Sequence, residues 1–381
     1  MNSYDVVVIG AGLAGLKVTE WLAARSHKVL LVDCKAKLTE NVHTTGIFVK
    51  RSFDDFEFPA ETLGPVVRDV VLYSPRMRSV KLQSVHDEFR VGRMPLLYSK
   101  LLENCRAAGA TILLGTRYCG RQQGASGSIV ELETGGVKTQ VETRFLVGAD
   151  GATSAVAGDL GLSQNRKWIV GVEEVYHNVP LSGPPVLHCV LHPRLAPGYL
   201  AWVAHDGEEV HVGVGGYARE FEPKKALVEF TEMAQQIVPL SQGEIIERRG
   251  GRIPVGGVLP KIVNSMGLLV GDAAGAVSPL TAGGLDPCLR LSQLAVDVLH
   301  DALTATSQNQ DPHSILARYN GRAFRNKFRL RLLMRSAIET VRSERLCEII
   351  CWMLRQPGGK QLAAKVFFGR GSFPDVGDHR S

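Results

Sequence analysis

Three glycines near the start of the chain have the spacing of a phosphate-binding turn. Gly10, Gly12 and Gly15 form a G-x-G-x-x-G motif. In such a motif the first glycine permits a tight turn and the second lets the backbone approach a pyrophosphate, while the third lets a helix pack closely on a strand. Alone, the motif is a weak signal, because many tight turns share it.

The residues around the glycines supply the context that the motif requires. Residues 6–9 are a continuous apolar run, typical of a strand buried on both faces of a parallel sheet. Residues 13–25 are rich in helix formers, and the start of that helix offers amides and a dipole to phosphate. A second strand, 28–32, ends at Asp33, roughly 20 residues beyond the glycines, where an acid accepts hydrogen bonds from a ribose. These features predict dinucleotide binding with NADP disfavoured, and both FAD and NAD fit.

Three further stretches contain groups suited to a cofactor. A lone arginine such as Arg93 is usually a solvated charge, but its guanidinium also suits a diphosphate. Asp150 follows a buried strand and, on the simplest interpretation, caps the next helix. Gly271 and Asp272 end another buried strand, and TAGGL at 281–285 can bring backbone amides to the N1/O2 edge of a flavin.

Three histidines are candidate proton donors. His205 precedes an Asp–Gly hairpin turn, and a surface position is the simpler interpretation. His211 lies in a predicted strand, where a structural histidine is favoured. His43 lies in a polar loop, so it is kept as a weak catalytic candidate beside a purely structural role. Water can also supply a proton, so the catalytic residue stays unknown at this point.

The composition is typical of a soluble enzyme. The chain has 381 residues, a formal net charge of +6 and 45% apolar residues. No apolar run approaches the roughly 20 residues that span a bilayer, and the early glycine motif leaves no room for a cleavable signal peptide. The seven cysteines include no C-x-x-C pair. This argues against disulfides and a metal site and predicts a cytoplasmic location.

Four stretches occur in an order that resembles one flavoprotein group. They are the glycine motif, the Arg93 position, LVGADGATSAV at 146–156 and LLVGDAAGAVSPLTAGGL at 268–285. Over nearly its whole length the chain resembles the FAD-dependent group that includes the aromatic hydroxylases, with the p-hydroxybenzoate hydroxylase fold, and the geranylgeranyl reductases. The resemblance implies that FAD is the cofactor.

The same resemblance implies roles for individual residues. The glycines and Asp33 would hold the ADP half of FAD, and Arg93 its pyrophosphate or ribityl chain. Tyr118 would lie by the adenine, Asp150 would support the fold near the pyrophosphate, and Asp272 would bind the ribityl chain or a phosphate. The complete set expected to bind FAD is Gly10, Gly12, Leu13, Ala14, Gly15, Asp33, Cys34, Lys35, Thr45, Gly46, Arg93, Tyr118, Asp150, Gly271, Asp272, Gly283, Gly284 and Leu285.

Within this group the chain is similar to the geranylgeranyl reductase branch. Hydroxylases typically have a histidine after GDAA, where this chain has Gly275. The segments WIVGVEEV at 168–175 and GRIPVGGVLP at 251–260 are each similar to reductase stretches. Two segments depart from the branch: Ala204 and His205 replace an aromatic–proline pair, and PLTAGGL at 279–285 replaces PLTGGGI or PLTGEGI. The loop around His43 also lacks the cysteine of some prenyl reductases.

The resemblance implies an FAD-dependent oxidoreductase that acts on a small apolar substrate. The leading hypothesis is reduction of carbon–carbon double bonds of an isoprenoid-like molecule by hydride transfer from FADH₂. The first alternative is a monooxygenase that hydroxylates or epoxidises an apolar or aromatic substrate through a flavin hydroperoxide, and the second is a flavin-dependent electron-relay or assembly protein. Because the sequence contains no second dinucleotide motif, the external reductant is expected to be transiently bound NAD(P)H or an electron-donor protein.

The order of strands and helices predicts how these residues are positioned. We expect an α/β fold, with a doubly wound, Rossmann-like FAD-binding domain, an inserted and mainly antiparallel β substrate domain, and a C-terminal helical region. The FAD-binding domain is expected at 1–72, 86–166 and 262–305, the substrate domain at 73–85 and 167–261, and the helical region at 306–381.

The helical region is strongly basic at its start. Between residues 313 and 335 there are seven lysines and arginines and no acid. A basic helix there is either a solvated face or a peripheral contact with anionic lipid, each cation contributing about 1 kcal/mol, and both interpretations stay open. No nucleic-acid-binding module appears, so no nucleic acid partner is expected.

Overall fold

The apolar run before the glycine motif forms the central strand of the largest sheet. In the computed structural model, which describes residues 1–124, 127–308 and 311–369, β1 (Asn2–Ile9) pairs in parallel with β2 (Val29–Val32) and β11 (Val137–Gly148). The order is β17–β18–β11–β1–β2–β8, and its outer members are β8 (Thr111–Leu113), β17 (Val263–Asn264) and β18 (Gly267–Leu269). Val6, Val7 and Val8 are completely buried, because both faces of the strand are covered.

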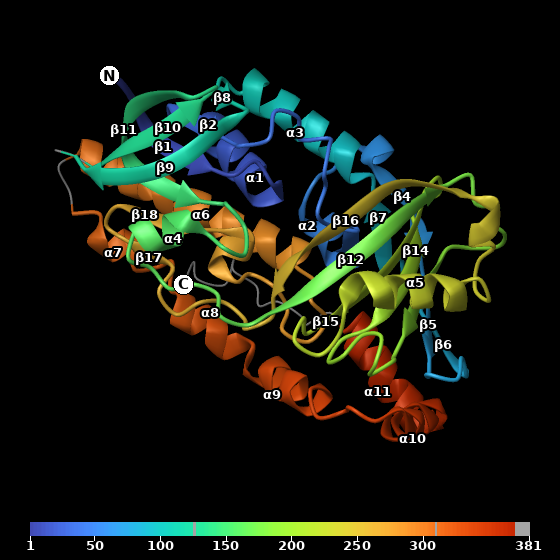
Figure 1. Cartoon of the computed structure of the whole chain (residues 1–381). Helices are drawn as coiled ribbons and strands as arrows, with labels where there is room; N and C mark the ends of the chain where they lie inside the picture. Colours follow the sequence, from blue (N-terminus) through green and yellow to red (C-terminus); the bar gives the residue numbers. More distant parts are fainter. Residues whose placement is uncertain (125–126, 309–310, 370–381) are drawn as a thin grey trace.

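Helices and an antiparallel extension complete this domain (Figure 1). Helix α1 (Leu13–Ala23) contacts both α3 (Met94–Ala107) and the long α6 (Leu285–Ser307). Strands β9 (Thr116–Gln123) and β10 (Ser128–Thr134) extend β11 as an antiparallel meander, against which the short α4 (Ala155–Asp159) packs. The expected α/β fold with parallel strands and covering helices is confirmed.

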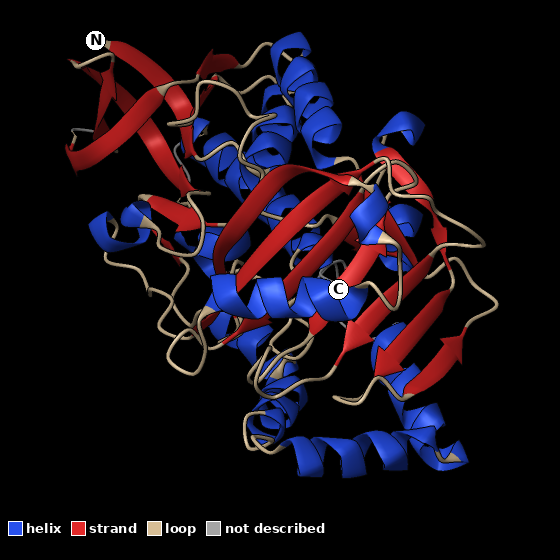
Figure 2. Cartoon of the chain, turned by 45° about the vertical axis from the view of Figure 1, so that its right-hand side comes forward, coloured by secondary structure: helices blue, strands red, loops and turns tan. Residues whose placement is uncertain are grey.

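The second sheet is almost entirely antiparallel. Its order is β16–β12–β15–β14–β13–β5–β6, and only β13 and β5 run in parallel. The bounds of its strands are Glu244–Pro254 for β16, Trp168–His177 for β12, Val210–Gly216 for β15, Ala201–His205 for β14, Val186–Val190 for β13, Asp69–Tyr73 for β5 and Ser79–Gln83 for β6. Helix α5 (Pro223–Ala234) covers one face of this sheet (Figure 2). The other face is therefore free to line a cavity.

A small third sheet is formed by strands that alternate in the sequence with strands of the two large sheets. It consists of β3 (Ile47–Val49), β7 (Phe89–Gly92) and β4 (Leu63–Val67), and α2 (Lys50–Asp55) follows β3 directly. The 69–83 hairpin formed by β5 and β6 joins the antiparallel sheet. The expected boundary between residues 72 and 73 was therefore wrong, because it cuts through β5.

The C-terminal region consists of several short helices. They are α7 (His313–Leu316), α8 (Gly321–Lys327), α9 (Arg329–Ile338), α10 (Glu344–Arg355) and α11 (Pro357–Phe368). The basic stretch is thus not one helix, and part of its charge is used internally. Arg318 pairs with Asp301 at 2.6 Å, and Arg335 is 1% exposed. Within the described residues, no helix has the length and apolar character needed to cross a membrane.

Candidate functional site

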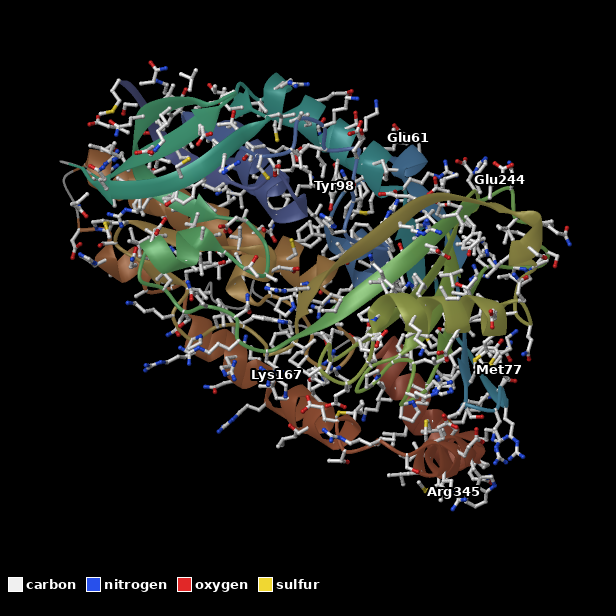
Figure 3. The ribbon with its side chains drawn as sticks, viewed as in Figure 1. Glu61, Met77, Tyr98, Lys167, Glu244 and Arg345 are labelled. Atoms are coloured by element: carbon white, nitrogen blue, oxygen red, sulfur yellow. The ribbon has the colours of Figure 1, made fainter. Side chains whose placement is uncertain are left out.

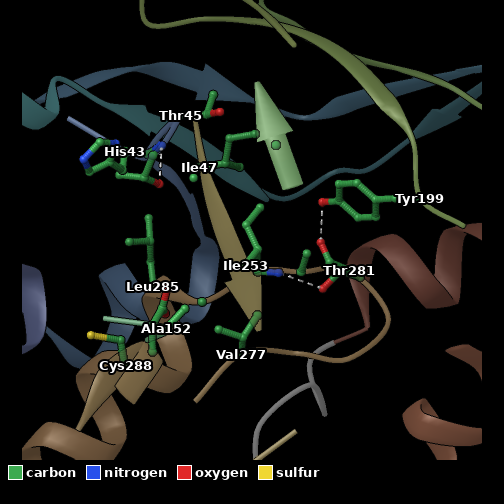
Figure 4. Close-up of a pocket in the computed structure, with 18 of the residues that line it drawn as sticks. His43, Thr45, Ile47, Ala152, Tyr199, Ile253, Val277, Thr281, Leu285 and Cys288 are labelled. Carbon is green, nitrogen blue, oxygen red and sulfur yellow. Dashed lines mark hydrogen bonds between the residues drawn. The ribbon is translucent and has the colours of Figure 1, made fainter. Parts of the chain in front are cut away.

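One large cavity connects the three parts of the chain. It has a volume of about 1240 Å³ and extends from the glycine motif to the C-terminal helices. The cavity wall brings together residues that are distant in the sequence, including Thr45, Tyr199 and Thr281 (Figure 4). The Tyr199 hydroxyl donates to the Thr281 carbonyl at 2.8 Å. All of the residues expected to bind FAD line this cavity except Gly15 and Arg93.

The glycines act as their spacing predicts. Gly10 has φ +103°, and a Cβ there would lie 2.3 Å from the Ala149 carbonyl oxygen. A Cβ on Gly15 would lie 1.8 Å from the Gly10 carbonyl oxygen, so α1 packs directly on the turn. Gly12 has open space beside it and lines the cavity. The turn therefore exposes backbone, rather than side chains, to whatever occupies this end of the cavity.

Two aspartates follow the strands on either side of β1. The Asp33 carboxylate accepts hydrogen bonds from the backbone amides of Ala11 at 2.6 Å and Lys35 at 2.8 Å, and it also lines the cavity. Asp150 accepts from the Ser154 hydroxyl at 2.6 Å and from two amides at the start of α4. Asp150 therefore caps that helix, as the simplest interpretation of the sequence proposed.

Asp272 presents a carboxylate that no other described residue hydrogen-bonds. It follows the buried β18 and lines the cavity, and burial alone raises its pKa to about 6. A carboxylate in such surroundings is costly unless it finds donors. The ribityl hydroxyls of FAD are donors of the required kind, and the open backbone at Gly12 suits the pyrophosphate. The residues present therefore fit FAD.

Arg93 has a side-chain partner that its sequence position did not predict. Its guanidinium forms an ion pair with Glu208 at 2.8 Å, and it does not line the cavity. Arg93 precedes α3, and its side chain extends toward the β14–β15 hairpin rather than toward the glycine motif. It links two parts of the fold, and its expected contact with the pyrophosphate or ribityl chain stays a prediction.

The candidate catalytic histidine lies at the cavity but is exposed. His43 lines the wall beside Thr44. A Cβ built on Gly251 would lie 3.7 Å from the Cβ of His43. Burial and the charge of Lys35 hold the pKa of His43 below its usual value. The imidazole is therefore largely neutral at neutral pH, and its part in proton transfer stays a prediction.

The strongest polar cluster was missed by the sequence analysis. Glu173 on β12 is 4% exposed and lines the cavity. Its carboxylate accepts hydrogen bonds from the Thr45 hydroxyl and from the Trp202 indole at 2.9 Å. It also pairs with His211 Nδ1 at 3.2 Å and with Arg249 at 3.6 Å. We call these five residues the Glu173 cluster; it ties the loop at Thr45 to the antiparallel sheet.

Charge is stabilised within this cluster. Burial disfavours both charged groups, but their mutual attraction and hydrogen bond outweigh it, so the pKa of Glu173 is lowered and that of His211 is raised.

His211 Nε2 is buried without a hydrogen-bond partner among the described residues. Asp206, Glu209 and His211 have ligand atoms within 4.8 Å of one another. However, Asp206 already accepts two backbone amides, and His211 Nδ1 faces Glu173.

The far end of the cavity is apolar, and we call it the apolar arm. Its walls come from β13, α10 and α11, which are distant in the sequence. They include Leu187, Cys189, Leu354, Ala363, Val366 and Phe367. Phe368 closes the same region by packing against Phe89, with 6.1 Å between ring centroids. Tyr98 from α3 lies at the other end, on the nucleotide side (Figure 3).

The comparison with known families settles the class of the protein. The model of the family described as "FAD binding domain" matches residues 3–320. The chain belongs to this family. It is an FAD-dependent oxidoreductase, and it is similar to geranylgeranyl reductases.

Two curated relatives have similar length. The chain is 26% identical over 313 residues to a digeranylgeranylglycerophospholipid reductase of Methanocaldococcus jannaschii, covering 81% of this chain and 80% of the relative. It is 27% identical over 359 residues to a menaquinone reductase of Mycobacterium tuberculosis, covering 87% and 84%. Both relatives are named as reductases.

Solved structures show the same fold. A geranylgeranyl bacteriochlorophyll reductase-like protein from Thermoplasma acidophilum superposes with a TM-score of 0.83 at 19% identity, covering 97% of this chain and 98% of the other. The p-nitrophenol 4-monooxygenase of Pseudomonas putida DLL-E4 gives 0.71 at 16%, covering 97% and 100%. The fold alone is therefore shared by reductases and monooxygenases.

Proposed function

We propose that this protein reduces carbon–carbon double bonds of an apolar, isoprenoid-like substrate. The observation that carries the proposal is that the cavity of the FAD-binding fold continues into the apolar arm. A volume of 1240 Å³ exceeds the roughly 300–1,000 Å³ of ordinary ligand pockets. There is room for a dinucleotide and for an extended apolar chain beside it.

The residues present suggest how the two ligands are held. Gly12, Asp33 and Asp272 would hold FAD, which supplies a hydride when it is reduced. The apolar arm would desolvate and align the chain of the substrate, since burying apolar area is favourable and non-directional. The orientation of the substrate then depends on the few polar groups between the FAD-binding end of the cavity and the apolar arm. Chief among them is the Thr45 hydroxyl, which Glu173 holds in place.

Reduction also requires a proton for the carbon of the double bond that does not receive the hydride. The Thr45 hydroxyl donates to Glu173, so its proton is committed to that bond. His43 is mostly neutral at neutral pH because its pKa is lowered. Water that enters from the exposed His43 side is therefore the proton donor in our proposal, and no side-chain acid is required. One hydride and one proton convert the alkene into the saturated product.

Monooxygenase chemistry is the second candidate, and the position after GDAA argues against it. Gly275 has φ +69°, and a Cβ there would lie 2.6 Å from the Gly257 carbonyl oxygen. The histidine typical of the hydroxylases therefore has no room at this position. The names of the two curated relatives also favour reduction.

Product analysis in air discriminates the two activities. The holoprotein is incubated with NADPH, or with a small electron-carrier protein as reductant, and with geranylgeraniol, and the extracted lipid is analysed by mass spectrometry. Gain of two hydrogen atoms per reduced bond supports the proposal. Gain of one oxygen atom would establish the monooxygenase instead. We propose that reductant enters transiently in either case, as the chain has one dinucleotide motif.

A further inference from the structure

Apolar side chains gather on the outer side of the C-terminal helices. Helix α10 has its two cysteines, Cys347 and Cys351, buried on the inner side, where the Cys347 thiol donates to the Leu191 carbonyl at 3.3 Å. Exposed apolar side chains lie on its outer side and also on α9 and α11. They are Leu330, Leu333, Leu346, Ile349, Trp352, Met353 and Leu362. We call these seven residues the apolar face.

This face is larger than scattered surface apolar residues would explain. Leu330 and Leu333 are 70% and 69% exposed, and Trp352 is 56% exposed. In α10, Leu346, Ile349 and Met353 follow at intervals of three and four residues, which places them on one side of a helix. Helices α9 and α10 lie along one edge of the molecule (Figure 1). Several large exposed apolar side chains on the helices of one region are typical of an interaction surface.

The surroundings of the apolar face are strongly basic. Residues 313–369 contain twelve lysines and arginines and three glutamates. Each glutamate has a partner: Glu339 pairs with Lys167 at 2.7 Å, Glu344 lies 3.7 Å from His192, and Glu348 accepts from the Arg76 amide at 2.8 Å. Exposed cations remain, among them Arg345, which extends from α10 at the same edge of the molecule (Figure 3).

The apolar face adjoins the apolar arm. Ile338 and Leu362 line the cavity and are also 38% and 58% exposed, so they lie where the cavity meets the surface. Ile350 and Leu354 line the cavity from α10, and each directly follows an exposed residue, Ile349 or Met353. The same short helices therefore form both the wall of the cavity and the apolar face.

We propose that the apolar face docks on an anionic lipid surface and that the substrate enters the cavity directly from that surface. Apolar side chains at helical spacing beside cations, with a tryptophan among them, are the features of helices that lie in a membrane interface. A second copy of the chain would bring two basic surfaces together, whereas anionic lipid complements them. This inference rests on the proposed function, because it assumes that the substrate is an apolar molecule dissolved in lipid.

Vesicle binding tests the inference. The holoprotein is mixed with vesicles of phosphatidylcholine, with or without phosphatidylglycerol, and the bound fraction is measured by flotation. Ile349→Ser with Trp352→Ser should weaken binding about tenfold or more, since two apolar side chains no longer enter the interface. The matched control is Val228→Ser with Ile246→Ser, which alters residues 59% and 52% exposed on α5 and β16. The control should bind like the unmodified chain, and added salt should weaken binding to anionic vesicles.

A fluorescence measurement locates the contact. Trp352 is exposed, whereas Trp21 and Trp168 are partly buried and Trp202 is buried. Vesicles with brominated acyl chains should therefore quench Trp352. Trp352→Phe should bind normally but lose the quenching, because phenylalanine keeps the apolar contact without the indole.

Three outcomes would overturn the inference. They are failure of the unmodified holoprotein to bind vesicles, equal binding by the Ile349/Trp352 variant, and conversion of a lipid-free dimer into a monomer by that variant in light scattering. The last would assign the face to a second copy. The proposed function is tested separately with a short, water-soluble isoprenoid alcohol. The variant should still reduce it, whereas failure of the unmodified chain to do so would contradict the function itself.

Discussion

Glu173 is a buried carboxylate in a mainly apolar strand that also contains Glu174, and its surroundings explain why it is tolerated there. Each of its oxygens has partners, and those partners come from β14, β15, β16 and the loop before β3. A buried charge of this kind is stable only while its partners remain. The Glu173 cluster therefore fixes the Thr45 loop against the antiparallel sheet.

Removal of the Glu173 charge should destabilise the protein in a pH-dependent way. Glu173→Gln leaves His211 buried without its counter-charge, at a cost of about 3–5 kcal/mol when His211 is charged. The raised pKa of His211 means that the charged pair contributes fully below the unfolded value of about 6.5 and that this contribution is lost as pH rises through the folded value. Urea unfolding of the holoprotein should therefore show a larger loss near pH 6 than near pH 8.5.

A neighbouring residue provides the control for this measurement. Glu174 is also buried but pairs with Arg248 at 3.0 Å and with the Tyr176 hydroxyl, on the opposite side of β12. This site contains no histidine, so Glu174→Gln should lose the same stability at both pH values. If the two variants showed the same pH dependence, the role given to His211 would be wrong.

Asp272 should control retention of FAD. Asp272→Asn replaces an acceptor with a group that also donates, and we expect about tenfold weaker retention. Because burial raises its pKa to about 6, the carboxylate becomes protonated as pH falls through that value, and retention by the unmodified chain should decline there. Flavin release after gel filtration measures both effects. Asp301→Asn, at a surface ion pair, is the control; unchanged retention in the Asp272 variant would contradict this placement.

At the residue scale, the sequence predicted roles that depend on backbone conformation. It did not predict roles that depend on side-chain partners distant in the sequence. The roles of Gly10 and Gly15 follow from their lack of a Cβ, which no distant residue can alter. The ion pair of Arg93 could not be predicted because its partner, Glu208, is remote in the sequence. Glu173 carried one usable signal, an acid within an apolar strand run, but its partners could not be named without the sheet register.

Among the elements, α10 and α11 contribute most of what the sequence could not predict. The fold of the nucleotide domain follows from local patterns: a buried strand, a glycine turn and a helix. The apolar arm instead depends on how α11 returns to the sheet, where Ala363 packs with Val70 and Leu82. No local pattern specifies that contact, and the basic stretch before it suggested one helix where the structure has three.

Filling the apolar arm should exclude long substrates. Ala363 is 5% exposed and lines the cavity, so Ala363→Trp would occupy space that a long chain needs. We expect the KM for a twenty-carbon isoprenoid alcohol to rise about tenfold or more, as an apolar contact is lost and a clash introduced. A ten-carbon alcohol and FAD retention should be little affected.

The adjacent residue on the same helix is the matched control. Ala364 is partly buried but does not line the cavity. Ala364→Trp should therefore leave the KM for the long alcohol near its original value. Equal effects of the two tryptophans would indicate damage to α11 rather than a blocked arm.

At the scale of the whole molecule, the cavity is assembled from three parts that are separate in the sequence. The glycine motif and Asp272 lie at one end, the Glu173 cluster near the junction, and the C-terminal helices at the other end. This arrangement suits a two-ligand reaction in which the cofactor stays bound and an apolar substrate enters from the far side. In our proposal, the substrate enters at the apolar face.

Anaerobic reoxidation of the flavin tests this account most directly. The holoprotein is photoreduced without oxygen and mixed with geranylgeraniol, and the absorbance of oxidised flavin is followed while the lipid is analysed by mass spectrometry. The account predicts that the oxidised flavin spectrum returns and that each flavin reoxidised yields one reduced double bond. A flavin that stays reduced until oxygen is admitted, with the alkene unchanged, would contradict it.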